Sequence, residues 1–230
     1  MLTAALGLLF VSDNAAQKPD ENYAEIFSDN YQQAMRFLQA EKTIDSVIIS
    51  RGLNPKEAVA VIFPELIRYN SIQDKIEIFA LETLYVQYGK KYADFSVSEF
   101  QIKPSFAEKI EIDFLNKVSD QELLTRYQIK VSDTVQNQEN RMKRLKKIKS
   151  KAGMVNYLCL FWKVMNTKYP NLKSQEEKIR FFATAYNSRY WASRQEIESF
   201  MAKKYFHTGF SITSAKYNYA DIAWYYFQQP

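Results

Sequence analysis

The sequence predicts a mainly α-helical protein. The 230-residue chain is 47% apolar and 15% aromatic, so it can bury one sizeable core. It holds only five glycines and six prolines, which argues against a turn-rich β architecture and against disorder. Apolar residues also recur at helical spacing along most of the chain. We therefore expect one helical domain over residues 31–230, with a short extended or β segment near residues 92–101.

The N-terminal stretch differs from the rest of the chain. Residues 2–11 are mostly apolar, too few to span a bilayer but typical of the core of a secretory signal. Ala15 and Ala16 offer small side chains for cleavage, although no Lys or Arg precedes the apolar stretch. We expect a signal peptide or its remnant over residues 1–16, with a frayed helix as the alternative, and a polar linker over residues 17–30.

The first helix of the domain is expected over about residues 30–50, before a turn at Gly52. A second helix follows, because Asn54 can cap it and Pro55 suits its first position, where no amide hydrogen bond is lost. Residues 58–63 are all apolar, which indicates a buried helix. We expect Pro64 to kink or end this helix.

Glu65 comes directly after this apolar run. A carboxyl group held against apolar surface has its charged form disfavoured, so its pKa should rise and it could act as a general acid near neutral pH. The alternative is a salt-bridged residue at a helix end, with Arg68 as its partner. Glu65 is our candidate for the chemistry.

Three segments resemble, in order, the motifs of the lysozyme-like lytic transglycosylases. Residues 52–65 resemble the helix that leads to the family's catalytic Glu. Residues 98–107 resemble its Gly-Leu-Met-Gln-then-Pro segment, and residues 185–189 its Ala-Tyr-Asn-x-Gly segment. The departures from the family's pattern are Leu66, Ser98, Glu99 and Arg189. The resemblance implies a lysozyme-like domain in which the extended segment lines a sugar cleft.

The resemblance also implies an activity, cleavage of the MurNAc–GlcNAc bond of peptidoglycan by a single Glu. In that family the Glu protonates the glycosidic oxygen. As a carboxylate it then deprotonates the muramyl 6-hydroxyl, which attacks its own anomeric carbon to give a 1,6-anhydro end. Glu65 takes this role because residues 52–55 align with it without a gap. Glu82 is the rival, because its interval to Gln101 is closer to the family's usual one.

The resemblance places three further residues in the cleft. Gln101 would bind sugar or cleft backbone, Tyr186 would lie on the cleft floor, and Asn187 would bond substrate or fix the loop. The alternatives are an ordinary loop residue for Gln101 and helix packing for the other two. A hydrolytic enzyme would need a second carboxylate. The candidates for that group are Asp94, Glu99 and Asp113.

Composition excludes several classes of site. Cys159 is the only cysteine and His207 the only histidine, which rules out internal disulfides, thiolate metal clusters and multi-histidine metal sites. The scattered glycines form no phosphate loop. We expect neither a metal nor an organic cofactor.

The net charge of +5 favours anionic partners. The densest basic run, residues 141–151, suits an amphipathic helix whose charged face is solvated or contacts wall polymer, lipid or nucleic acid. We expect an exported protein of the periplasm or cell envelope that binds peptidoglycan glycan strands, alone or in an envelope assembly, and no nucleic acid. Two alternatives stay open: a non-catalytic peptidoglycan-binding or scaffold domain of the same fold, and a helical nucleic-acid or membrane binder organised by residues 141–151.

Overall fold

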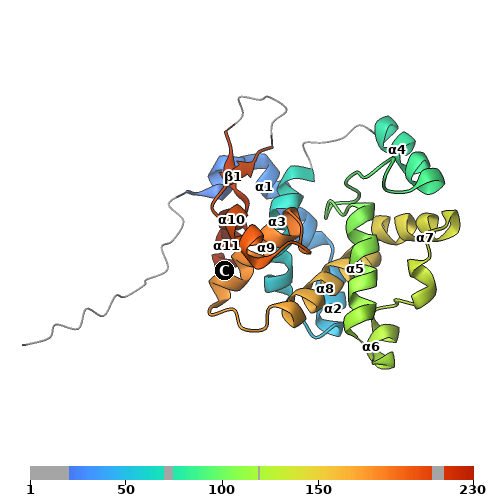
Figure 1. Ribbon diagram of the computed structural model, residues 1–230. Coiled ribbons are helices and arrows are strands. Elements are labelled where there is room, and N and C mark those ends of the chain that lie inside the picture. The colour runs from blue at the N-terminus through green and yellow to red at the C-terminus, as the bar shows by residue number, and fades with distance from the viewer. Residues whose placement is uncertain (1–20, 70–74, 119, 209–214) are drawn as a thin grey trace, which may run out of the picture.

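The computed structural model describes residues 21–69, 75–118, 120–208 and 215–230, and the fold is mainly α-helical as predicted (Figure 1). The described residues form eleven α-helices, one 3-10 helix and a two-stranded antiparallel sheet. The expected signal segment, residues 1–16, lies outside the described residues. None of the helices in the described part of the chain combines the length and apolar character that a membrane span requires.

The single N-terminal helix expected over about residues 30–50 is wrong, because the chain forms two helices there and the first of them already begins at Tyr23. The two helices are α1 (Tyr23–Ala40) and α2 (Thr43–Ser50), and the chain also bends inside α1 at Ser28, whose φ is 40°. The linker expected over residues 17–30 therefore extends no further than Asn22, which caps α1. A buried aromatic stripe was the missed signal: Tyr23, Phe27 and Tyr31 recur every four residues and face the core.

The central helix is α3 (Pro55–Tyr69), in which every residue from Ala58 to Ile67 is buried. Asn54 accepts a hydrogen bond from the backbone N–H of Glu57 at 3.2 Å, which confirms the predicted cap. The helix continues through Pro64, so of the kink or end expected there, the end is wrong. The hydroxyl of Tyr219 donates to the carbonyl oxygen of Val61, in the turn that the proline perturbs. Burial on all sides outweighs the proline's local cost.

The remaining helices surround α3 and α8 (Lys151–Lys168). On one side, α1, α9 (Gln175–Asn187) and α11 (Tyr219–Gln228) pack against α3; on the other, α2, α5 (Pro104–Lys117) and α7 (Gln138–Lys149) pack against α8 (Figure 1). The other elements are α4 (Lys75–Tyr88), α6 (Gln121–Arg126), η1 (Val131–Thr134), α10 (Arg194–Met201), β1 (Lys204–Phe206) and β2 (Tyr217–Asn218).

The segment expected to be extended, residues 92–101, forms no regular strand. Its end is a tight hairpin closed by a bridge between Val97 and Ile102. Two residues of the hairpin, Ser98 and Gln101, adopt left-handed backbone conformations, with φ of 63° and 52°. The hairpin leads directly into α5.

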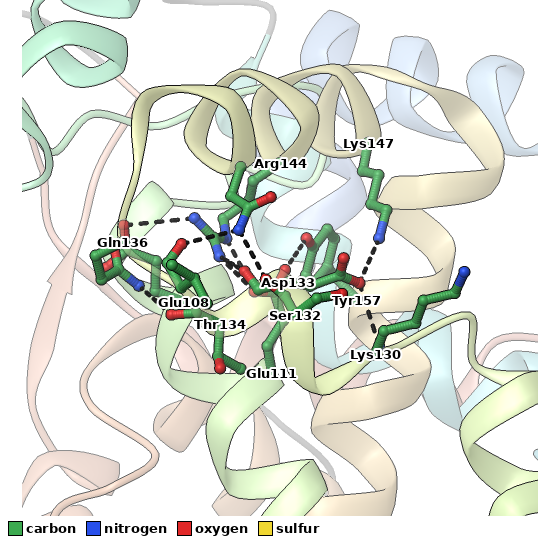
Figure 2. Close-up of polar contacts among 12 residues, drawn as sticks. Glu108, Glu111, Lys130, Ser132, Asp133, Thr134, Gln136, Arg144, Lys147 and Tyr157 are labelled. Carbon is green, nitrogen blue, oxygen red and sulfur yellow. Dashed lines mark hydrogen bonds and ion pairs between the residues drawn. The ribbon is translucent and has the colours of Figure 1, made fainter.

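The basic run, residues 141–151, is not one solvated helix. It is the end of α7 and the start of α8, which meet at Ser150, a residue that caps both helices. Arg144 is buried, and Figure 2 shows it pointing from α7 toward Glu111 and Glu108 of α5. Its guanidinium lies 2.6 Å from Oε2 of Glu111. The other carboxylate oxygen of Glu111, Oε1, accepts a hydrogen bond from the hydroxyl of Tyr157. Part of the run is therefore a structural element of the core.

Candidate functional site

A pocket of about 200 Å³ lies where α3, the 97–102 hairpin and the C-terminal end of α9 meet. Glu65 enters it from α3, Gln101 from the hairpin, and Tyr186 and Asn187 from α9. The four residues that the sequence singled out for one site thus line one pocket, although they lie on three separate segments. The complete lining is Glu65, Arg68, Ser96, Gln101, Ile102, Lys103, Ser105, Phe106, Tyr186, Asn187, Ser188 and Trp191.

The carboxyl group of Glu65 is almost fully enclosed, with 5% of its side chain exposed. Burial raises its pKa above the ordinary value of 4.5. The charges of Arg68 and Lys103 and a hydrogen bond from Tyr219 act in the opposite direction, without cancelling the effect of burial. The site therefore favours the protonated acid, and it also holds groups that stabilise the carboxylate once it forms.

Arg68 is the salt-bridge partner that the sequence offered as an alternative reading of Glu65. One guanidinium nitrogen lies 3.4 Å from Oε2 of Glu65, one helical turn away on α3. The guanidinium also lies over the ring of Phe206, 4.8 Å from its centroid. This salt bridge lies inside a pocket rather than on an open surface. Glu65 is therefore both a buried carboxyl group and the salt-bridge partner of Arg68, the two alternatives that the sequence offered.

Tyr186 forms the buried floor beside Glu65. Its hydroxyl donates to the backbone carbonyl of Phe100 at 2.9 Å, which fastens α9 to the hairpin. Burial raises the pKa of Tyr186 well above its usual range, and the nearby charge of Glu65 adds to the effect. The same two causes raise the pKa of Tyr219, so both phenols stay neutral hydrogen-bond donors.

Gln101 holds the hairpin in shape. Its side-chain amide donates to the backbone carbonyl of Ser98 at 3.0 Å, a bond within the hairpin itself. Ser98 stands where the resembled motif has glycine, and its φ of 63° is the kind of conformation that favours glycine. Serine in place of glycine at position 98 thus keeps the turn, but in a backbone conformation that is strained for a residue with a side chain.

Asn187 is the last residue of α9. Its side-chain Nδ2 atom is buried and has no hydrogen-bond partner among the described residues. A buried donor without an acceptor is costly, so such groups are uncommon unless a ligand or water completes them. An acceptor oxygen on a bound molecule would satisfy this amide.

Eight of the twelve lining residues were not predicted as parts of the site, and three of these eight carry a charge or a large exposed aromatic ring. Arg68 and Lys103 bring positive charge close to Glu65, and Trp191 lies on the rim with 41% of its surface exposed. Trp191 follows Asn187 by only four positions, a signal that could have identified it. Lys103 follows Gln101 by two positions, inside the segment that resembles the second motif, so its position was a comparable signal.

Glu82 does not share the pocket. It lies on α4 and forms an ion pair with Lys149 of α7 at 2.8 Å. The three candidates for a second carboxylate do not line the pocket, although the partner of Asp94, Ser105, does. Asp94 accepts hydrogen bonds from Ser105, Glu99 pairs with Lys151, and Asp113 binds Lys109 and Tyr190. Among the described residues, Glu65 is the only carboxylate that lines the pocket.

No group of three or more potential metal ligands occurs within the described ranges. Cys159 is buried in α8, and burial raises the pKa of its thiol to about 12, which leaves it unreactive. The pocket is therefore best described as an enclosed acid with hydrogen-bond donors around it. Comparison with protein-family models, with curated proteins and with solved structures finds no match to this chain.

Proposed function

We propose that this chain is a lysozyme-like lytic transglycosylase that cleaves the MurNAc–GlcNAc bond of peptidoglycan, with Glu65 as its single acid and base. One observation carries the proposal: Glu65, Gln101, Tyr186 and Asn187 line the same pocket. The resemblance singled them out from three distant segments before any geometry was available. A set of unrelated residues would have no reason to converge in this way.

The electrostatics of the pocket support this chemistry. A protonated Glu65 can give its proton to a glycosidic oxygen, because burial keeps its pKa above the ordinary value. The carboxylate that remains is stabilised by Arg68 and by the hydroxyl of Tyr219. It can then take the proton of the muramyl 6-hydroxyl as that oxygen attacks the anomeric carbon. The proton acquired by Glu65 restores the acid for the next cycle.

The absence of a second carboxylate from the described lining favours this route over hydrolysis. Hydrolytic glycosidases usually place two carboxyl groups across the sugar, one of them to activate water or to attack the anomeric carbon. Here the described lining offers Glu65 alone. An internal hydroxyl nucleophile needs no such partner. Action on peptidoglycan would place the protein in the periplasm or cell envelope, in keeping with a signal over residues 1–16.

A second candidate function is peptidoglycan binding without cleavage. Two observations favour it: Arg68 already pairs with Glu65 at 3.4 Å, and the pocket of about 200 Å³ is below the roughly 300–1,000 Å³ of typical small-molecule sites. A glycan would have to displace Arg68 or widen the rim to reach the acid. The two functions share the binding surface and differ only in whether the bond breaks.

The test is solubilisation of purified peptidoglycan by the wild type, by Glu65→Gln and by Glu82→Gln. The change at Glu82 is chemically identical but lies outside the pocket, so it is the matched control. We expect Glu65→Gln to lower the rate at least about 100-fold, as loss of a general acid does, and Glu82→Gln to leave it unchanged. Circular dichroism of each variant checks that the fold is intact.

Three outcomes would contradict the proposal in different ways. Equal rates for Glu65→Gln and the wild type would remove Glu65 as the acid. Loss of activity only in Glu82→Gln would transfer that role to Glu82. Sedimentation of folded wild type with peptidoglycan that stays intact would favour the binding function.

A further inference from the structure

Helix α4 is apolar around its circumference but covered on one side only. From Ile78 to Tyr88 its sequence contains a single charged residue, Glu82. A helix of this composition is ordinarily buried on all sides. Instead, α4 packs against α7 through a side that includes the buried Tyr85, at one edge of the molecule (Figure 1).

Between Ile78 and Tyr88, the open side of α4 carries no charge. All the exposed residues between Ile78 and Tyr88 are uncharged, namely Phe79, Ala80, Thr83, Leu84, Gln87 and Tyr88. Phe79 is 71% exposed. Glu82 is turned toward α7, where Lys149 neutralises it at 2.8 Å. Solvent-facing helix surfaces normally carry charged side chains, so this face is unusual for a surface left in water.

The apolar surface extends beyond α4 in both directions. Past its C-terminal end, Tyr92 is 68% exposed and its ring lies 5.2 Å from the ring of Tyr88. On the other flank, a groove of about 420 Å³ separates α4 from α7 and includes the exposed Met142. Contiguous apolar surface of this kind marks an interaction site.

Basic side chains border this apolar surface. Lys91, beside Tyr92, and Lys146, on the wall of the groove, are exposed and form no ion pair with any described residue. Lys143 and Lys149 lie on the same helix, α7, and add further positive charge that is partly balanced by Glu139 and Glu82. An uncharged aromatic face bordered by lysines is complementary to a surface that is apolar inside and negatively charged outside.

We propose that α4 and the adjoining side of α7 lie on an anionic lipid bilayer. Phe79, Leu84 and Tyr88 would enter the boundary between headgroups and acyl chains, and the lysines would reach the lipid phosphates. A peptide seated in the groove would cover Phe79 and Met142. It would leave Tyr88 uncovered, because Tyr88 is nine positions from Phe79 and so half a turn around the helix. A bilayer covers both flanks at once.

The proposal is independent of the Glu65 pocket, and its test is sedimentation of the full chain with lipid vesicles. Vesicles of phosphatidylcholine alone are compared with vesicles that also contain phosphatidylglycerol. Phe79→Ser with Tyr88→Ser removes the apolar anchors, and Lys91→Glu with Lys146→Glu reverses the unpaired charges. The matched controls are Ile49→Ser with Phe200→Ser, and Lys117→Glu with Lys173→Glu, which make the same changes at exposed positions elsewhere.

We expect the wild type and both controls to bind the phosphatidylglycerol vesicles, and to bind less well as the salt concentration rises. The aromatic and the lysine double variants should each bind at least about tenfold more weakly. The first loses two apolar anchors, and the second loses two lysines, each of which contributes about fivefold near an anionic surface. Binding by these variants equal to that of the controls would overturn the proposal, as would no binding by the wild type. Vesicle-free self-association that Phe79→Ser with Tyr88→Ser abolishes would assign the surface to a second copy instead.

Discussion

Glu65 is held in surroundings that favour its neutral form, and that preference has a measurable effect on folding. In the unfolded chain the carboxyl ionises near its ordinary pKa of 4.5, whereas burial raises the pKa in the folded state. Above that pH the unfolded state binds fewer protons than the folded state. The stability of the folded protein therefore falls as the pH rises from about 4.5 toward the raised pKa.

The first prediction is that Glu65→Gln removes this pH dependence. The free energy of unfolding of the wild type should fall relative to that of Glu65→Gln from pH 4.5 upward and level off above the raised pKa. Urea unfolding of both proteins across this pH range measures the difference between their free energies of unfolding. The contributions of the other titrating groups are common to both proteins and cancel in this difference. A difference that stays constant with pH would mean that Glu65 ionises as it does in water.

The second prediction concerns Trp191 on the rim of the pocket. The chain has three tryptophans, of which Trp162 and Trp224 are buried and Trp191 is 41% exposed. Quenching of tryptophan fluorescence by acrylamide should therefore report mainly on Trp191, and peptidoglycan fragments should protect it in Glu65→Gln, which leaves the glycan intact. Trp191→Ala in that background should weaken binding about fivefold, because burial of the indole face contributes about 1 kcal/mol.

Phe200→Ala is the control for this experiment, because it truncates another half-exposed aromatic side chain outside the pocket. In the same Glu65→Gln background it should bind fragments as the Glu65→Gln parent does. Undiminished quenching in the presence of saturating fragments would place the glycan away from Trp191.

At the scale of single elements, local sequence predicts what local interactions decide. The cap at Asn54 and the burial of residues 58–63 follow from residue type and spacing, and both are confirmed. Of the kink or end expected at Pro64, the end is wrong, since neighbouring helices enclose α3 and override the proline's preference. The strands β1 and β2 were not predicted either. Each is at most three residues long, and each is a strand only because it pairs with the other.

The third prediction tests the element that joins α7 to the core. Arg144→Met removes the guanidinium that binds Glu111 and the backbone carbonyl of Asp133 (Figure 2). The same guanidinium also donates to the hydroxyl of Tyr85. Two buried carboxylates, Glu108 and Glu111, would then lose their buried cation. Breaking a buried ion pair from one side typically costs about 3–5 kcal/mol, and urea denaturation should show a loss of this size.

Lys143→Met is the control, because Lys143 neighbours Arg144 on α7 but its ion pair with Glu139 is exposed. Its denaturation midpoint should match that of the wild type. Equal midpoints for the two variants would mean that the buried cluster contributes no more than a surface pair does.

At the scale of the whole molecule, the mainly α fold could be predicted because composition and apolar period act along the entire chain. The sequence also singled out the four residues that share the pocket, although it could not show that they meet. Their convergence depends on the hairpin and on the bond between Tyr186 and Phe100, which joins segments far apart in sequence. For the same reason the sequence did not show that Lys103 lies close to Glu65. It also left Glu82 as the rival candidate for the catalytic acid, because only the packing of α4 against α7 shows that Glu82 lies outside the pocket.

The central claim is that one buried glutamic acid cleaves the glycan without consuming water. The most direct measurement is digestion of purified peptidoglycan in water enriched in heavy oxygen, with the soluble fragments analysed by mass spectrometry. We predict fragments with 1,6-anhydro ends that carry no heavy oxygen and are absent from digests with Glu65→Gln. Reducing ends that carry heavy oxygen would contradict this account, because they would show that water, activated by a second group, is the nucleophile.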